Sequence, residues 1–425
     1  MESLEQRSGY IDSIRRFKPN AKLFLASVSL SQIAMAAFGL LLNIYLRQLG
    51  YSKSFLGIFT TVNLISSGLI AVPAGMFTDR IGRKGALLLS IALATVACLG
   101  QVYFTASAAI LLAFSALRGA SNTFKSIVQS PLLVENSNKR ERMHLFSVNA
   151  ALSHVSGMLG NSLAGLLPVF IMDSLGIIDT INPVPLRYSL VASALFWLFS
   201  ALPVMFMREE PTVKGARSQT LRISELLASP IPRNLAVYNM FIGFGAGLVV
   251  PFFNVFLTEQ LNAGTEQVGF IMAGSSVVLI FAVLLSPRLV ERFGKVKSVV
   301  LSQGSSIPLL LVMGLSPGIW PVTIAYWLRH GLMNLSSPIT SSFAMEVVEP
   351  EQRATTASLI SMANNLCRAV SATVGGFMMD KFGNGSPYFL TAVIYSAAVL
   401  WYYTHFHEEE IALQARLRSG VGYGD

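Results

Sequence analysis

Long runs without any Asp, Glu, Lys or Arg limit what this chain can fold into more than any other feature. Such runs span residues 23–46, 54–78, 145–172, 188–207, 234–258 and 267–287. About 20 apolar residues in a helix cross the hydrocarbon core of a bilayer. Charged residues make up only 12% of the 425 residues, whereas a typical soluble domain has about 25%. The sequence therefore predicts a polytopic membrane protein.

Two further apolar runs are too long for one span each and divide at turn signals. Residues 85–117 break near Thr105, and residues 298–328 break at Ser316-Pro-Gly318. The second part of each run continues beyond a lone arginine, and runs at 354–379 and 382–406 complete the set. We therefore expect an all-α protein with twelve transmembrane helices.

The distribution of Lys and Arg predicts the orientation of these spans. Most of the 31 basic residues fall in the segments that share a side with the N-terminus. Because cytoplasmic loops carry the excess of Lys and Arg, both termini are expected in the cytoplasm, with the chain in the cell (inner or plasma) membrane. The net charge of +9 then reflects this asymmetry and does not indicate a nucleic-acid partner.

A short charged motif recurs in the second half of the chain. Asp79-Arg-Ile-Gly-Arg83 returns as Glu291-Arg-Phe-Gly-Lys295 at an offset of 212. At an offset of 211, four residues return in the same order, matching Arg118 with Arg329, Glu135 with Glu346, Arg142 with Arg353, and Asn43 with Asn254. We interpret this as two homologous six-span halves. The expected segments are a cytoplasmic start (1–22), a first bundle (23–207), a linker (208–233), a second bundle (234–406) and a cytoplasmic tail (407–425).

The motif resembles a signature of the major facilitator superfamily. The family pattern is matched in full by Gly75, Asp79, Arg80, Gly82, Arg83 and Lys84, and in a degenerate copy by Glu291, Arg292, Gly294 and Lys295. Arg118-Gly119 resembles a second family motif. The resemblance covers nearly the whole chain and implies two pseudo-symmetric six-helix bundles. It also implies a central cavity, which the bundles open alternately to each side as they rock.

The resemblance further implies that the motif is a conformational latch. Asp79 is expected against the start of the eleventh span, where the helix dipole favours an anion, and the cations of the six-residue loop 79–84 are expected to pair with carboxylates such as Glu135. Exposed pairs contribute about 0–1 kcal/mol each, which suits a contact that must release. The alternative is that these charges only fix topology. The second-half counterparts and their neighbours complete the candidate latch: Arg142, Glu291, Arg292, Gly294, Glu346 and Arg353.

Four basic side chains fall inside spans, and no Asp or Glu does. They are Arg118, Lys125, Arg329 and Arg368. Intramembrane charges cost about 2.5–3.5 kcal/mol each on insertion scales and are usually functional. Arg368 has no counterpart in the first half, which favours a role specific to the solute; structural bonding or snorkelling is the alternative for the other three cations. The remaining candidate contacts are Asn43, Asn254, His154 and Asn365.

These features favour a secondary transporter for a small anionic organic solute over other classes. The spans contain no paired carboxylates, HExxH or GxSxG, so no catalytic residues, metal or cofactor are predicted. The sequence also lacks a P-loop, so ATP is not expected to be the energy source. Gly157 to Pro168 matches the antiporter motif of drug-efflux relatives incompletely, so a polyspecific efflux pump stays an alternative, and a receptor or scaffold a weaker one. The expected partners are the solute, the lipid bilayer, and a coupling proton or counter-transported solute. The chain is expected to be a monomer.

Overall fold

The computed structural model describes residues 17–138, 142–179, 182–208, 228–349 and 352–419, and their regular elements are all helices. Parts of the expected N-terminal segment, linker and tail lie outside the described residues. The first half of the sequence forms α2 (Pro19–Gln48), α3 (Lys53–Tyr103), α4 (Ala108–Glu135), α5 (Arg142–Leu175), α6 (Val184–Phe199) and α7 (Ala201–Met205). The second half forms α9 (Pro230–Val249), η2 (Val250–Phe252), α10 (Phe253–Gln260), α11 (Thr265–Phe293), α12 (Lys295–Leu315), α13 (Ile319–Val347), α14 (Arg353–Phe382) and α15 (Ser386–Ser419).

These helices correspond to the twelve predicted spans. α3 contains two of them, joined at Gly82, whose backbone is not helical. α6 and α7 form one span with an interruption at Ser200. α9, η2 and α10 form another, interrupted near Pro251, because a proline ring cannot donate a backbone hydrogen bond inside a helix. Each remaining helix matches one predicted span, so the all-α fold class is confirmed.

Several element boundaries differ from the sequence expectation. The six-residue loop expected at 79–84 is a single-residue turn, because the helix continues to Ile81 and resumes at Arg83. α9 begins at Pro230, before the expected end of the linker. α15 continues to Ser419, past the expected start of the tail at 407.

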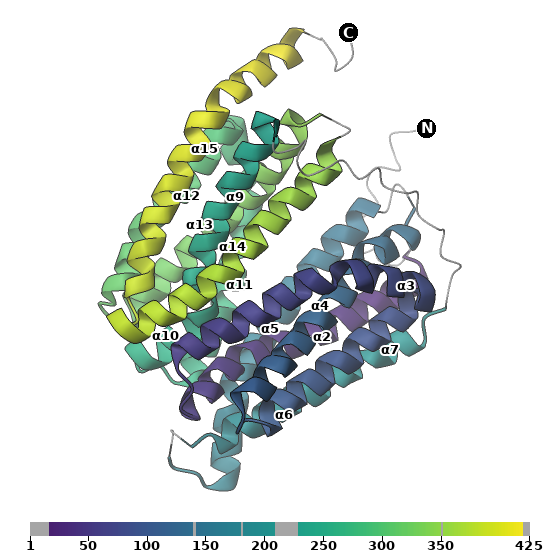
Figure 1. Cartoon of the computed structure of the whole chain (residues 1–425), viewed down its shortest axis with the longest axis vertical. Helices are drawn as coiled ribbons and strands as arrows, with labels where there is room; N and C mark the ends of the chain where they lie inside the picture. The colour runs from purple at the N-terminus through teal and green to yellow at the C-terminus, as the bar shows by residue number, and fades with distance from the viewer. Residues whose placement is uncertain (1–16, 139–141, 180–181, 209–227, 350–351, 420–425) are drawn as a thin grey trace. The chain divides into compact units, whose positions relative to one another are not determined.

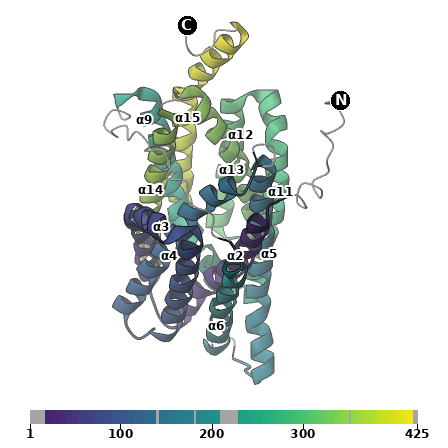
Figure 2. The same cartoon turned by 90° about the vertical axis from the view of Figure 1, so that its right-hand side faces the viewer.

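The chain forms two compact units. Unit 1 comprises residues 1–49, 62–216 and 264–273, and unit 2 comprises residues 50–61, 217–263 and 274–425. Within unit 1, α2 packs against α5 and α6; within unit 2, α9 packs against α14 and α15 (Figures 1 and 2). In both cases the first span of a half contacts the fifth and sixth spans of that half. The packing thus follows the repeat found in the sequence.

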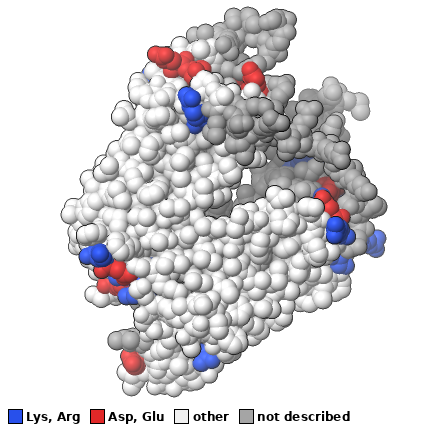
Figure 3. Space-filling view, in the orientation of Figure 1, with Lys and Arg blue, Asp and Glu red and all other residues white. Residues whose placement is uncertain are grey.

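Apolar side chains are buried in the core and also exposed on the surface. Tyr402, Phe343 and Phe406 are fully buried in unit 2, whereas Leu69 and Val72 on α3 are 75% and 73% exposed. The face in Figure 3 is mostly uncharged, and the charged residues visible there lie in small groups. Such a surface suits a lipid environment.

In the described chain, seven helices are long and apolar enough by length and composition to cross a membrane. The helices that carry the four intramembrane cations, α4, α13 and α14, are not among these seven. The C-terminal helix α15 is not among them either.

Candidate functional site

The signature motif surrounds the turn at Gly82. Arg83, at the start of the second helical part of α3, lies 3.5 Å from the Glu135 carboxylate at the end of α4 and 3.8 Å from Asp79. The structure therefore brings together two residues that the sequence expected to pair. The Asp79 side chain is 76% exposed and lies in the last helical turn before Gly82, where the helix dipole disfavours a carboxylate. Its expected contact with the start of α14 stays a prediction.

The second copy of the motif makes the equivalent ion pair. The Lys295 ammonium, which follows Gly294, contacts the Glu346 carboxylate at the end of α13 and donates to Ser342 Oγ at 3.0 Å. Lys295 and Glu346 occupy the positions of Arg83 and Glu135 in the repeat. Both halves therefore join the start of their third span to the end of their fourth span through one salt bridge.

A carboxylate from the C-terminal helix completes this second copy. Glu410 of α15 is buried and accepts the backbone N–H of Lys295 at 2.5 Å and that of Val296 at 3.1 Å. These N–H groups belong to the unsatisfied first turn of α12. The sequence placed Glu410 in the expected cytoplasmic tail, and only its position in the tertiary structure identifies it as a helix cap. Glu291, the acidic residue that the motif predicted, is exposed.

The other predicted motif residues lie around these pairs. The described structure displays no further ion pair between them and a carboxylate. Arg353 donates to the Val348 carbonyl at 3.3 Å. Arg292 is exposed and stacks over Phe293. The remaining positions are either on the surface or half-buried: Gly75, Arg80, Lys84 and Arg142.

A cluster that the sequence did not predict lies where α3 begins, inside unit 2. Asp380 of α14 accepts the Ser54 hydroxyl at 2.6 Å and the backbone N–H groups of Ser54 and Lys53 at 2.7 and 3.2 Å. Lys53 Nζ also lies 2.7 Å from Glu259 of α10. Asp380 therefore acts as the N-terminal cap of a helix from the other sequence half.

Two of the intramembrane cations lie on α4 in unit 1. The Arg118 guanidinium lies 5.8 Å from the centre of the Phe38 ring on α2. Lys125, two helical turns further along α4, donates to Ser31 Oγ at 2.9 Å and to Gln32 Oε1 at 3.3 Å. Both cations therefore face α2, as their seven-residue spacing predicts.

The other two cations lie on α13 and α14 in unit 2. Arg329 is 6% exposed, and its guanidinium carbon lies 5.6 Å from the centre of the Tyr395 ring. Arg368 is half-buried, and Tyr395 lies within electrostatic range of both arginines. Gly247 permits the close approach of α9 to α14, because a Cβ at this position would collide with the Arg368 carbonyl and the Ser371 hydroxyl.

The polar atoms around Arg329 are not all satisfied. Its Nε and the Tyr388 hydroxyl are both buried without a hydrogen-bond partner in the described structure. Tyr388 lies within electrostatic range of Arg329 and Tyr326, and the Tyr326 ring stacks on Phe253 at 3.8 Å. Buried polar groups are usually paired. The cluster of Arg329, Tyr326, Tyr388 and Tyr395 therefore has spare donor capacity; we call it the arginine–tyrosine cluster.

No carboxylate of the described residues lies within ion-pair distance of Arg329, Arg368 or Lys125. The ion pairs that the structure displays lie near helix ends instead. Among the described residues, the positive charges of Arg329, Arg368 and Lys125 thus face neutral acceptors and aromatic rings, and a positive charge removed from water in this way favours an anionic ligand.

Sequence reasoning missed the tyrosines of α15. Tyr388, Tyr395 and Tyr402 are spaced by seven residues and are all buried, so they share one face of the helix. This spacing was visible in the sequence and could have indicated a buried polar stripe. The spacing does not show, however, which of the three faces Arg329.

The neutral polar candidates divide into buried and exposed residues. Asn254 is buried on α10, and Asn43 is half-buried on α2. Asn365 is exposed and bonds to Ser361 one turn away, and His154 is exposed on α5. The structure therefore does not bring His154 or Asn365 into the described polar clusters.

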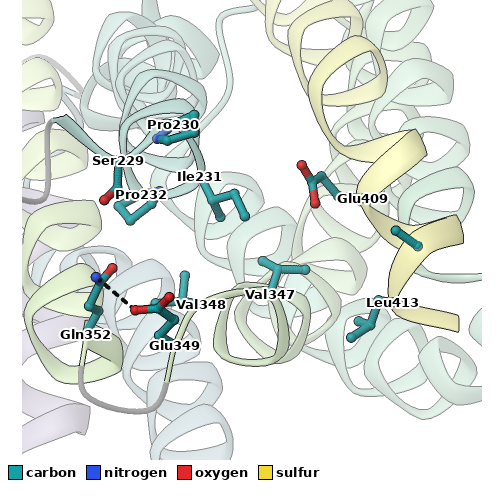
Figure 4. A pocket seen from close by; sticks show the side chains of 11 residues that line it. Ser229, Pro230, Ile231, Pro232, Val347, Val348, Glu349, Gln352, Glu409 and Leu413 are labelled. Atoms are coloured by element: carbon teal, nitrogen blue, oxygen red, sulfur yellow. Dashed lines mark hydrogen bonds between the residues drawn. The ribbon is translucent and has the colours of Figure 1, made fainter. Parts of the chain in front are cut away.

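A pocket of about 280 Å³ lies elsewhere in unit 2, among the start of α9, the end of α13 and the later part of α15. Figure 4 shows Ile231, Val347 and Leu413 around its apolar part, with Glu349 bonded to Gln352 at 3.2 Å. None of the predicted substrate residues lines this pocket, and its carboxylates, Glu349 and Glu409, do not suit an anion.

Comparisons with known proteins agree with the repeated helical architecture. The family model described as Major Facilitator Superfamily matches residues 24–242 and again residues 235–418. No curated protein matches the chain. A bacterial homolog of the human lysosomal transporter Spinster is 15% identical, with a TM-score of 0.73 over 91% of this chain and 97% of that one.

Two further solved structures have the same fold. The nucleoside transporter NupG is 12% identical with a TM-score of 0.74 over 91% of this chain and 98% of that one. A D-xylose–proton symporter is 15% identical with a TM-score of 0.70 over 93% and 98% of the two chains. At these identities the likeness shows the fold alone.

The family match over both halves defines a multi-pass membrane transporter of the secondary type, which works by alternating access. The chain belongs to the Major Facilitator Superfamily, a family of transporters and not of enzymes.

Proposed function

We propose that the chain transports an anionic organic solute, with Arg329 and Arg368 as the principal contacts. The observation that carries this proposal is the arginine–tyrosine cluster, where Arg329 is 6% exposed and its Nε has no partner in the described structure. A carboxylate or phosphate matches the planar guanidinium with two parallel hydrogen bonds. The Tyr388 hydroxyl would supply a further donor.

The other candidate residues have supporting roles in this proposal. Arg118 and Lys125 are proposed as supporting cations, and Asn43 and Asn254 as neutral hydrogen-bonding groups. His154 and Asn365 keep a role only if they face the solute at another stage of the cycle. The solute moves with a coupling proton or in exchange for a second solute, and the chain acts as a monomer in the cell membrane with both termini cytoplasmic.

The motif around Gly82 serves as the latch of the cycle. The Arg83–Glu135 contact holds the motif to α4. Asp79 is 76% exposed, has only a long contact with Arg83 among the ion pairs described, and is disfavoured by the dipole of its own helix, so we propose that it binds the start of α14 during the cycle. The Lys295–Glu346 pair has the same role in the second half. These contacts are partly exposed, so each one is weak enough to break during transport.

The solved structures with this fold carry different cargoes. Their descriptions name nucleosides and D-xylose, and a further match is a bacterial homologue of the iron transporter ferroportin. Their cargoes therefore give no common solute class for this chain, and the proposal depends on the charges within its own spans.

A thermal-shift screen on the purified protein tests the solute class. The probes are succinate and glucose 6-phosphate as acids, glucose as a neutral compound, and tetraphenylphosphonium as a lipophilic cation. We expect an acid to raise the melting temperature, because positive groups in the spans would gain a counter-charge. Stabilisation by tetraphenylphosphonium alone would instead support the efflux alternative.

Replacing Arg368 by Lys tests the proposed contact. The variant keeps the charge but loses the bidentate geometry, so affinity for the stabilising acid should weaken about tenfold or more, a loss of about 1–3 kcal/mol. Arg288→Lys is the matched control, because Arg288 is exposed on α11. Unchanged affinity in Arg368→Lys would remove Arg368 from the site.

A further inference from the structure

Lys125 differs from the other intramembrane cations because it can lose its charge. The guanidinium groups of Arg118, Arg329 and Arg368 stay protonated in proteins. A lysine that is removed from water changes its protonation state more readily, and Lys125 is half-buried. The predicted span interiors contain no Asp or Glu, the side chains that would otherwise hold and release a proton. A proton-coupled cycle in this chain therefore needs another group.

The contacts of Lys125 are all neutral. Nζ donates to Ser31 Oγ at 2.9 Å and to Gln32 Oε1 at 3.3 Å, both on α2. Ser31 in turn donates its hydroxyl hydrogen to the Val28 carbonyl at 3.0 Å. The ammonium is therefore held by two acceptors without a counter-charge.

This arrangement satisfies the side chain in both protonation states. In the charged form, the ammonium donates to Ser31 and Gln32. In the neutral form, the amine still donates to Gln32, and its lone pair accepts the Ser31 hydroxyl, which rotates away from the Val28 carbonyl. A proton can leave and return without leaving a buried polar group unpaired.

Few charged groups compete with Lys125 on the helices that surround it. On α4, Arg118 lies two turns away and Glu135 is paired with Arg83. Packed α3 has no charged residue from Ser54 to Thr78. The other ionisable residues of the packed helices lie near helix ends, on the later part of α3 or, for His154, on an exposed surface. They are Lys22, Tyr45 and Arg47 on α2; Lys53, Asp79, Arg80, Lys84, Cys98 and Tyr103 on α3; and Arg142, His144, His154 and Asp173 on α5.

We propose that Lys125 carries the coupling proton of the transport cycle. Its ammonium releases a proton to water on one side of the membrane, leaving the electron pair on Nζ, and the amine takes up a proton on the other side. Loss of the charge weakens the link from α4 to Ser31 and Gln32 on α2, so protonation biases the two access states. This inference rests on the proposed transport function but not on the charge of the solute.

Spin labels on the two units test this inference without any solute. Cysteines replace Ile178 in unit 1 and Leu315 in unit 2, which are 94% and 72% exposed, in a Cys98→Ala/Cys367→Ala background. In liposomes, the distance distribution measured by pulsed EPR should change its populations across about pH 6 to 10. Lys125→Arg should hold the low-pH distribution, and Lys125→Met the high-pH distribution, at every pH.

Two further variants sharpen this test. Ser31→Ala removes an acceptor that binds the charged form more strongly than the neutral one, so the midpoint of the pH response should move to lower pH. Lys297→Met should keep the response unchanged, because Lys297 is an exposed lysine on α12. A pH-independent distribution in the parent protein, or a retained response in Lys125→Met, would overturn the inference. Neither result bears on the solute class, because no solute is present.

Discussion

Gly82 and Gly294 adopt the same backbone conformation, with φ 78° and ψ 169° in the first case and φ 79° and ψ 174° in the second. This region of backbone space is essentially restricted to glycine. Each glycine ends one span and starts the next in a single residue. The repeat seen in the sequence is thus a repeat of local geometry, and each turn is followed by a cation that pairs with a glutamate at the end of the fourth span of its half.

Alanine at either glycine should destabilise the protein. The strained backbone costs about 1–3 kcal/mol, and at Gly294 a Cβ would also lie 2.9 Å from Glu410 Oε1. Gly294→Ala should therefore lower the melting temperature in detergent more than Gly82→Ala does. Gly68→Ala and Gly304→Ala are the controls, because both glycines are helical with open space around them; these controls should be neutral or slightly stabilising. Equal melting temperatures in all four variants would contradict the argument.

The sequence predicted the parts of this protein that depend on local spacing. The charge-free runs predicted the spans, and the offset of 212 predicted that Gly82 and Gly294 are equivalent. The pairing of Arg83 with Glu135 was expected from the family resemblance, and the structure displays this contact. These features depend on periodicity or on residue order, which a single sequence contains.

The sequence could not predict contacts that join distant helix ends. Glu410 lies 115 residues after Lys295, and Asp380 lies 326 residues after Ser54. Nothing in the local pattern distinguishes these carboxylates from solvated ones. Tyr395 was also missed, because its pairing with Arg329 depends on how α13 and α15 pack.

Glu410→Gln should be more harmful than Glu291→Gln. Glu410 caps the first turn of α12 with both carboxylate oxygens, and its negative charge also favours the positive end of the helix dipole. We expect a loss of about 0.5–2 kcal/mol in unfolding free energy for Glu410→Gln, measured by chemical denaturation in detergent. Glu291 is exposed, so Glu291→Gln should be near wild type. A larger loss of stability in Glu291→Gln than in Glu410→Gln would show that Glu291, and not Glu410, supplies the cap of α12.

Asp380 should make the protein sensitive to acid. Partial burial alone would raise the pKa of this carboxylate, but hydrogen bonds from Ser54 and Lys53 and the charge of Lys53 outweigh it and hold the pKa below the usual range. A carboxylate whose pKa is lower in the folded state than in the unfolded state stabilises the fold at pH values above its unfolded-state pKa. This stabilisation is lost as the pH falls through the folded-state pKa. The melting temperature should therefore fall below about pH 4.

The variant Asp380→Asn isolates this effect. It should be less stable than the parent at neutral pH, and the difference between the two proteins should shrink as pH falls. Asp173→Asn serves as the control, because Asp173 is exposed at the end of α5. A difference that stays constant down to about pH 3 would show that Asp380 contributes no charge-dependent stability.

Asp79→Asn should reduce transport while leaving stability almost unchanged. The Asp79 side chain is 76% exposed and its contact with Arg83 is long, at 3.8 Å, so little folding energy depends on it. In the proposed cycle Asp79 binds the start of α14 in one of the two access states, so removing its charge weakens that access state and not the other. Uptake into proteoliposomes of the acid identified by the thermal-shift screen measures this loss, with Asp173→Asn again as control. Normal transport by Asp79→Asn would mean that the motif only fixes topology.

Tyr388→Phe should have opposite effects on stability and on solute binding. The Tyr388 hydroxyl is buried without a partner in the described structure, so removing it should stabilise the empty protein by about 1–3 kcal/mol. If the hydroxyl donates to the solute beside Arg329, the same change should weaken binding of the stabilising acid about tenfold, a loss of about 1.4 kcal/mol. Tyr402→Phe is the matched control, because the Tyr402 hydroxyl is also buried and unpartnered but its ring packs against Tyr238, Phe343 and Phe406. That variant should gain stability without losing affinity. Thermal shift with and without the acid measures both quantities, and equal affinities in the two variants would exclude Tyr388 from the solute site.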